Sequence, residues 1–290
     1  MELQGCYTAL VTPFRNGKVD LEALGRLIEE QITAGIDGLV PVGTTGESPT
    51  LDFEEHQDVV RFTVETVAGR CQVIAGTGAN CTAEAVRLTR HAASVGADAT
   101  LQVTPYYNKP TAEGLYRHFA AVADEGGLPV VLYNVPSRTG KEIDIQTVHR
   151  LAQHPLIVAI KEAGGSADRV SQILSGCGIT VLCGDDSLTL PMMSLGATGV
   201  ISVASNVVPA DVTNMVHAAL EDNWEEARDL HYRLYPLFRD LFVETNPVPV
   251  KAALAMLGKI AEEYRLPLCP ISPAAREVLK AAMKAAGLAV

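Results

Sequence analysis

The segment Ile157-Val-Ala-Ile-Lys-Glu-Ala163 is one of eight short apolar runs that alternate with amphipathic stretches, about thirty residues apart. Such a run is typical of a strand that is buried on both faces of a parallel sheet. The predicted strands are Cys6–Phe14, Gly38–Gly43, Gln72–Gly78, Ala99–Pro105, Pro129–Val135, Ile157–Ala163, Thr180–Asp185 and Gly199–Ala204. Eight strands that alternate with helices predict an α/β fold, a closed (β/α)8 TIM barrel, and a doubly wound open sheet is the alternative.

Helical periodicity fills the intervals between the predicted strands. One apolar stripe begins at Leu21, and Asp20 is placed to cap its first turn. Beyond the eighth strand, the chain continues as three predicted helices, Trp224–Phe242, Pro249–Ile260 and Ser272–Ala286. We therefore expect residues 1–222 to form the catalytic barrel and residues 223–290 to form a C-terminal helical annex that packs against it.

The composition narrows the class of protein. A length of 290 residues suits one α/β barrel, and the low aromatic content of 5% leaves an aliphatic core. The net charge of -11 argues against a nucleic acid or an anionic membrane as partner. No apolar run approaches the ~18 residues needed to span a bilayer, and no secretory leader is recognisable. We expect a cytoplasmic protein.

The sequence lacks the usual motifs of metal and cofactor sites. The six cysteines are scattered without a C-x-x-C pair, and the seven histidines fall mostly on helix-like segments without ligand spacing. Asp185-Asp186 has no evident acidic partner at another strand end. Gly76-Thr-Gly78 begins like a dinucleotide fingerprint, but Cys81 occupies the third glycine position. We expect no metal and no cofactor.

Lys161 stands near the carboxyl end of the predicted strand 157–163, where the reacting groups of TIM barrels lie. An amine flanked by apolar barrel strand is desolvated, which favours the neutral form that attacks carbonyl groups. Pairing with Glu162 is the ordinary alternative. However, adjacent strand residues point to opposite faces, so Glu162 is poorly placed to serve an inward Lys161. Lys161 is therefore the candidate Schiff-base nucleophile for a small 2-oxo acid.

Polar groups at other strand ends are candidates for holding such a substrate. The turn Gly43-Thr-Thr-Gly-Glu47 offers N–H groups and hydroxyls to a carboxylate, although an ordinary turn or helix cap has the same pattern. Tyr106-Tyr107 and Tyr133 supply phenols that either relay protons or pack at the rim. Arg138, in the loop predicted after the fifth strand, suits bidentate capture of a carboxylate, or is an idle surface residue.

Together these segments resemble the pyruvate-dependent class I aldolase-like family, to which N-acetylneuraminate lyase belongs. The resemblance runs from about Gly5 to beyond Ser205 and is weaker through the annex. It rests on the segments Gly43-Thr-Thr-Gly-Glu47, Ala75-Gly-Thr-Gly-Ala-Asn80, Val103-Thr-Pro-Tyr-Tyr-Asn-Lys-Pro110, Tyr133-Asn-Val-Pro-Ser-Arg-Thr-Gly140 and Ile160-Lys-Glu-Ala163.

The resemblance is strongest to those members that condense pyruvate with L-aspartate 4-semialdehyde in lysine and diaminopimelate biosynthesis. It implies a lyase in which Lys161 forms the Schiff base. Thr44, Tyr107 and Tyr133 match the family's hydroxyl relay. Thr45 matches the residue that holds pyruvate's carboxylate.

For the rest of the site, the resemblance implies that Arg138 clamps the carboxylate of the semialdehyde and helps place Tyr133. Ile201 matches a backbone contact near the lysine. An aldolase of N-acetylneuraminate or of a 2-keto-3-deoxy sugar acid is the alternative, but its polyol aldehyde has no nearby carboxylate for Arg138.

The resemblance also implies a homotetramer, a dimer of dimers in which Tyr107 crosses into a neighbouring subunit. L-lysine inhibits some members at the dimer interface. The matching residues here are Ser48, His56, Asn80, Glu84 and Tyr106, whereas Phe53 stands where some lysine-sensitive relatives have a second histidine.

Two functions from other classes remain open on the residues alone. One is a non-catalytic barrel that binds a metabolite carboxylate through Thr45 and Arg138. The other is a phosphate-binding isomerase, which Gly184-Asp-Asp186 disfavours because an acidic loop repels phosphate.

Overall fold

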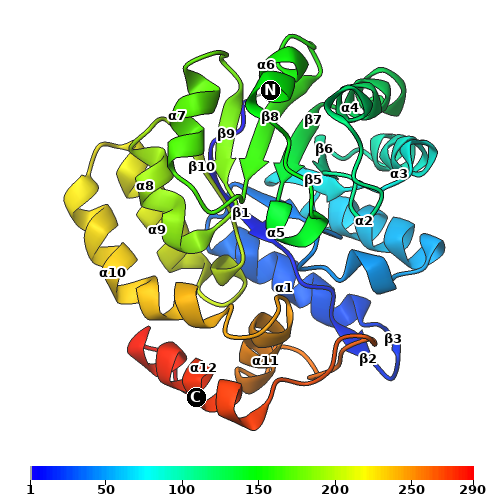
Figure 1. The fold of residues 1–290 in the computed structure, drawn as a ribbon. Coiled ribbons are helices and arrows are strands. Elements are labelled where there is room, and N and C mark those ends of the chain that lie inside the picture. Colours follow the sequence, from blue (N-terminus) through cyan, green and yellow to red (C-terminus); the bar gives the residue numbers. More distant parts are fainter. Residues whose placement is uncertain (1) are drawn as a thin grey trace.

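The computed structural model describes residues 2–290, and its eight parallel strands close into a barrel (Figure 1). The ladder follows chain order and closes where the first strand pairs with the last. The strands are β1 (Gly5–Ala9), β4 (Gly38–Val40), β5 (Gln72–Gly76), β6 (Ala99–Val103), β7 (Val130–Asn134), β8 (Ile157–Glu162), β9 (Thr180–Cys183) and β10 (Gly199–Ser202). The predicted TIM barrel is confirmed, and the doubly wound open sheet is wrong.

All eight predicted strands are present, but each ends before the predicted residue. The first was extended to Phe14 and stops at Ala9, and the second was extended to Gly43 and stops at Val40. The residues beyond the strand ends leave the ladder because they form the loops and turns of the barrel mouth. A short antiparallel hairpin, β2 (Phe14–Arg15) with β3 (Lys18–Val19), was not predicted.

Helices surround the barrel, as the periodicity predicted. They are α1 (Leu21–Thr33), α2 (Phe53–Val67), α3 (Thr82–Ser94), α4 (Ala112–Gly126), α6 (Ile145–Leu151), α7 (Asp168–Leu174), α8 (Thr189–Met193) and α9 (Pro209–Leu220). Asp20 caps α1, since its Oδ1 accepts a hydrogen bond from the Ala23 N–H at 3.0 Å. Single turns of helix, η1 (Ser48–Thr50), α5 (Pro136–Thr139), η2 (Asp186–Leu188) and η3 (Ala204–Asn206), occupy loops that follow strands.

Three further helices complete the chain at one edge of the molecule (Figure 1). They are α10 (Trp224–Asp240), α11 (Val248–Met256) and α12 (Pro273–Ala285). Helix α10 packs against α9, and α12 packs against both α10 and α11. The segment after α11 also touches the β2–β3 hairpin, where Glu263 accepts the Asn16 N–H at 2.8 Å. Within residues 2–290, no helix is long and apolar enough to cross a membrane.

Side chains of the strands alternate between two separate cores. Ala159 belongs to the small core inside the barrel, whereas Ile160 belongs to the large core between strands and helices. The next inward position of β8 is Lys161, and the next outward position is Glu162. This alternation brings an amine to the inside of the barrel at the end where the site forms.

The packing of α3 on α4 buries His118, which generates a prediction on acid stability. Its Nδ1 lies 2.9 Å from Oγ1 of Thr82, and its Nε2 has no hydrogen-bond partner among residues 2–290. Burial lowers the pKa of His118 from 6.5 to about 4. As pH falls, the unfolded chain therefore takes up a proton first. The stability due to neutral His118 is complete above pH 6.5 and is lost between pH 6.5 and 4.

We predict that the free energy of unfolding falls less on acidification in His118→Gln than in the wild type. The difference should reach up to about 3 kcal/mol over this pH range, because glutamine takes up no proton. Urea unfolding of both proteins at pH 7 and at pH 4.5 checks this. Equal losses of stability in the two proteins would contradict it.

Candidate active site

Two adjoining cavities open at the carboxyl ends of the barrel strands. The smaller, of about 160 Å³, is bordered by five of the predicted site residues, Thr44, Thr45, Tyr133, Arg138 and Lys161. The larger, of about 230 Å³, shares three of these residues and extends to Ser48 and Tyr106. Residues from three separate βα units therefore meet in one space that can hold a small molecule.

Lys161 is the central amine of this site. It lies at the end of β8, is only 5% exposed and borders the smaller cavity. In the β7–β8 ladder it is paired with Tyr133, and its Nζ lies 4.4 Å from the centre of the Tyr133 ring. Asp185 borders the same cavity. Burial raises the pKa of its carboxyl group, while the charge of Lys161 lowers it. The amine thus has one phenol and one carboxyl group nearby, together with open space.

Glu162 faces away from Lys161, as strand alternation predicted. Its carboxylate accepts hydrogen bonds from Asn134 Nδ2 at 2.9 and 3.1 Å and from Arg169 Nε at 3.1 Å. Burial raises the pKa of Glu162 although Arg169 and Asn134 oppose the shift. The cross-strand bond from Asn134 to Glu162 lies one residue beyond the Tyr133–Lys161 pair. It therefore holds β7 and β8 in the register that places the phenol beside the amine.

The turn Gly43–Glu47 contributes Gly43, Thr44 and Thr45 to the border of the smaller cavity. The Thr12 hydroxyl donates to the Gly46 carbonyl at 2.7 Å, which ties the turn to the segment after β1. Asn246 Nδ2 donates to Thr45 Oγ1 at 3.0 Å, so the Thr45 hydroxyl proton is free to point elsewhere. Gly76 permits this geometry, because a Cβ there would lie 2.4 Å from the Val42 carbonyl oxygen.

Arg138 follows β7, as predicted, and the segment that carries it forms the single helical turn α5. Pro136 begins this turn with a pre-set φ, and Gly140 ends it with a φ of +64°. Arg138 borders both cavities, and its Nη2 donates to the Asn246 carbonyl at 3.1 Å. The guanidinium is therefore oriented over the site and keeps further N–H groups for a ligand.

Two predicted site residues do not border these cavities. Tyr107 is 90% exposed with a φ of +70°, so its phenol lies outside the cavity of its own chain. Ile201 is fully buried in the inner core, and Val203 borders the cavity on that side instead. The sequence reasoning also missed Phe242 and Asn246, which reach the cavity from the annex. Asn246 is 201 residues from its partner Thr45, a distance over which no local pattern operates.

The residues matched to a lysine effector lie around the larger cavity. Ser48 and Tyr106 border it, and Asn80 Nδ2 donates to the Tyr106 carbonyl at 3.4 Å. Burial, with a contribution from the charge of Glu84, raises the pKa of Tyr106. His56 is buried behind the cavity, with Nε2 at 2.9 Å from the Gly76 carbonyl oxygen. Four of the five residues are thus near one another, and the imidazole is already engaged.

The two acidic residues at the end of β9 do not make a cluster for a metal. Asp186 is buried and accepts hydrogen bonds from the N–H groups of Val203 and Ala204 at 3.0 and 3.1 Å. Across residues 2–290, no group of three or more potential metal ligands comes together.

Comparison with known proteins matches residues 2–286 to the model described as the Dihydrodipicolinate synthetase family. A 4-hydroxy-tetrahydrodipicolinate synthase from Aquifex aeolicus is 55% identical over 284 residues, 96% of this chain and 97% of that protein. One from Thermodesulfovibrio yellowstonii is 53% identical over 287 residues, 98% and 99% of the two chains. The solved structure of the synthase from Methylacidiphilum fumariolicum SolV has a TM-score of 0.98 at 54% identity, covering 99% of this chain and 96% of that one.

Three other similar structures carry information on ligands and assembly. The dihydrodipicolinate synthase of Acinetobacter baumannii, 44% identical with a TM-score of 0.96, is in complex with pyruvate. The synthase of Cyanidioschyzon merolae, 42% identical with a TM-score of 0.95, has lysine bound. A third, 42% identical with a TM-score of 0.96, is a monomeric variant. Each match covers 97% or more of both chains.

The network around Glu162 generates a prediction on stability. Glu162→Gln removes a buried charge and leaves the Arg169 guanidinium partly uncompensated, so we expect a loss of about 1–3 kcal/mol in the free energy of unfolding. Urea unfolding measures it. Glu113→Gln, which breaks exposed ion pairs with Arg117 and Arg150, is the matched control and should change stability little. Equal effects of the two substitutions would refute the importance of the buried network.

Proposed function

Because the chain belongs to the dihydrodipicolinate synthetase family, we propose that it condenses pyruvate with L-aspartate 4-semialdehyde through a Schiff base on Lys161. The product is 4-hydroxy-tetrahydrodipicolinate, an intermediate of lysine and diaminopimelate biosynthesis. The observation that carries the assignment of the nucleophile is the position of Lys161, a buried amine that opens into a cavity at the carboxyl end of β8.

The reaction begins when the neutral amine of Lys161 attacks C2 of pyruvate. The resulting carbinolamine loses water and becomes a protonated imine, which draws electrons from the methyl group. Loss of a methyl proton gives an enamine, whose carbon attacks the aldehyde of the semialdehyde and forms the new C–C bond. The substrate's own amine then attacks the imine carbon. This closes the ring and releases Lys161 as a free amine.

Each of these steps moves a proton, and hydroxyl groups near the amine supply the route. Tyr133 lies against Lys161, and Thr44 borders the same cavity, so these two can pass protons to and from the reacting atoms. We assign Tyr107 of a neighbouring subunit as the third member of the relay. Its 90% exposure and its position outside the cavity of its own chain support that assignment.

Anion-binding groups on either side of Lys161 fix the two substrates. We assign Thr45 and the turn around it to the carboxylate of pyruvate, because Thr44 and Thr45 border the cavity and the Thr45 hydroxyl keeps its proton to donate. Arg138 is assigned to the carboxylate of the semialdehyde, which its planar fork can bind in bidentate fashion. Ile201 is assigned a backbone contact in the wall near the lysine.

The relay assigned to Tyr107 requires assembly, so we propose a homotetramer built as a dimer of dimers. One similar structure is that of a monomeric variant, so the oligomeric state of this chain needs to be measured.

We propose residues 1–222 as the catalytic barrel and residues 223–290 as its annex. The proposed compartment is the cytoplasm, in keeping with the free thiols of all six cysteines.

The Schiff base is testable by reduction. Incubation with pyruvate and borohydride should add a covalent mass increment to the peptide that contains Lys161. Lys161→Ala should abolish the increment and lower kcat at least about a thousandfold, because the covalent route is lost. Lys18→Ala, on the exposed β2–β3 hairpin, is the control and should behave as wild type. An increment that persists in Lys161→Ala, or faster turnover with sugar aldehydes than with aspartate semialdehyde, would contradict the proposal.

We also propose feedback inhibition by L-lysine at Ser48, His56, Asn80, Glu84 and Tyr106, supported by the relative that has lysine bound. Tyr106 adjoins Tyr107 in the chain and borders the larger cavity, which offers a short route between the two sites. Phe53 departs from the pattern, and its ring is covered by the Arg87 guanidinium at 3.3 Å.

Millimolar L-lysine should therefore lower the initial rate of the wild type. Glu84→Gln should weaken this inhibition because it removes the carboxylate assigned to the ammonium group of the effector, and the basal rate should persist. Steady-state kinetics at several lysine concentrations measure both effects. An initial rate that is unchanged by millimolar lysine would end the hypothesis.

A further inference from the structure

A fully buried ion pair joins the annex to the turn that borders the smaller cavity of the active site. Lys251 lies on α11, and Glu47 is the last residue of the turn Gly43–Glu47. The Nζ of Lys251 donates to Oε1 of Glu47, and neither side chain is exposed to solvent. The two residues are 204 positions apart in the chain. The mechanism proposed above uses neither of them.

Among residues 2–290, Glu47 is the one carboxylate that forms an ion pair with Lys251, and the charge of the more distant Glu263 acts in the same direction. Its Nζ lies 4.2 Å from the centre of the Phe14 ring and 5.3 Å from that of the Tyr264 ring. Burial lowers the pKa of Lys251, whereas the charge of Glu47 raises it. The carboxylate of Glu47 is therefore the main group that opposes the effect of burial on this amine.

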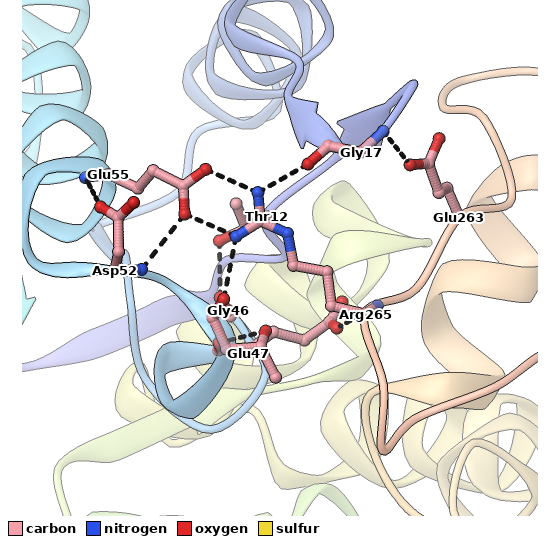
Figure 2. A network of polar contacts seen from close by, with 9 residues as sticks. Thr12, Gly17, Gly46, Glu47, Asp52, Glu55, Glu263 and Arg265 are labelled. Atoms are coloured by element: carbon pink, nitrogen blue, oxygen red, sulfur yellow. Dashed lines mark hydrogen bonds and ion pairs between the residues drawn. The ribbon is translucent and has the colours of Figure 1, made fainter.

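The segment after α11 also binds the second carboxylate oxygen of Glu47. The Arg265 N–H donates to Glu47 Oε2 at 3.4 Å, and the Arg265 guanidinium forms a bidentate pair with Glu55 at 2.5 and 2.6 Å. Figure 2 shows Arg265 between Glu55, Gly17 and Glu47. The Arg265 guanidinium also donates to the carbonyl of Thr50 at 2.9 Å, so the segment that follows the turn is held from the annex as well.

The backbone of the turn depends on the position of Glu47. Glu47 has a φ of +54°, a left-handed conformation that is unfavourable for a residue with a side chain. Its N–H donates to the Thr44 carbonyl at 3.1 Å, which closes the turn around Thr44 and Thr45. The side-chain pair with Lys251 compensates for this conformation, because it fixes the carboxylate beneath the turn.

A second attachment from the annex reaches the same substrate site. The side-chain amide of Asn246 donates to Thr45 Oγ1 at 3.0 Å, while the Asn246 carbonyl accepts from Arg138 at 3.1 Å. One short segment, Asn246 to Lys251, thus contacts both groups that are assigned to substrate carboxylates.

From these contacts we infer that Lys251 and Glu47 are positioning residues for the pyruvate carboxylate, and that the annex completes the active site. The inference rests on the proposed function. Lys251 fixes Glu47, Glu47 fixes the turn, and the turn presents the hydroxyl and N–H donors to pyruvate. Lys251 itself is fully buried and borders neither of the two active-site cavities. Its loss therefore affects the binding of pyruvate before it affects the chemistry at Lys161.

The test compares charge removal at the pair with charge removal elsewhere on the annex. Lys251→Met alone leaves Glu47 buried without its partner, so the main variant is the double substitution Glu47→Gln with Lys251→Met. The matched control is Lys259→Met, which breaks the annex-to-barrel ion pair with Glu30 but does not touch the turn. Full-length wild type and variants are compared by steady-state kinetics, thermal unfolding and borohydride trapping with pyruvate.

We expect the double variant to raise KM for pyruvate roughly ten- to a hundredfold, as small displacements of binding groups do. Its kcat at saturating pyruvate should change much less, and Lys161 should still be trapped at high pyruvate. Lys259→Met should leave KM for pyruvate unchanged. If the double variant does not fold, Glu47→Gln alone serves, because glutamine keeps the shape and an acceptor for Lys251. It should change KM in the same direction.

A folded double variant or Glu47→Gln variant with wild-type KM for pyruvate would overturn the inference. So would an equal rise in KM for Lys259→Met, which would mark a general effect of loosening the annex. Failure of the proposed function is recognised separately, because wild type itself would then form no adduct with pyruvate.

Discussion

The burial of one amine inside an apolar barrel is the constraint on which the rest of the structure depends. A charged lysine is costly to bury without a partner, and Lys161 nevertheless stands at an inward position of β8 with 5% exposure. Strand alternation sends Glu162, the nearest acid in the chain, to the outer face, where Arg169 pairs with it. What remains beside the amine is the Tyr133 ring, the half-buried carboxyl group of Asp185 and open space. A small carbonyl compound that enters this space can reach the amine.

Two buried polar networks hold the walls around that amine. The charged residues in each network take no part in the proposed reaction. On one side, Asn134, Glu162 and Arg169 lock the register of β7 and β8 from outside the barrel. On the other, Lys251 and Glu47 tie the turn Gly43–Glu47 to α11. Glu162 and Arg169 lie in β8 and α7, and Lys251 lies in α11, so the turn that ends at Glu47 is held by a helix. Buried contacts therefore join the annex to the turn that borders the cavity, although the annex follows the barrel in the chain.

The sequence allowed prediction of the features that rest on local patterns. Alternation of apolar runs and helical stripes located all eight strands and the annex helices. The rule that reacting groups lie at strand ends selected five residues that the structure gathers around one cavity: Thr44, Thr45, Tyr133, Arg138 and Lys161. Strand ends were overextended because apolar residues continue past the ladder into the mouth. The contributions of Asn246 and Lys251 could not be predicted, since their partners are 201 and 204 residues away. The strand-end rule also selected Tyr107, but its role in a neighbouring subunit came from the family resemblance, and its exposed position in one chain shows why no local pattern assigns it a partner.

A crystal structure of the protein after borohydride reduction with pyruvate tests the central claim most directly. The account predicts continuous density from Lys161 Nζ to the former carbonyl carbon, with the pyruvate carboxylate on the turn at Thr44 and Thr45 and the Lys251–Glu47 pair intact beneath it. Density for unlinked pyruvate beside an unmodified Lys161, or a carboxylate that binds away from this turn, would contradict it.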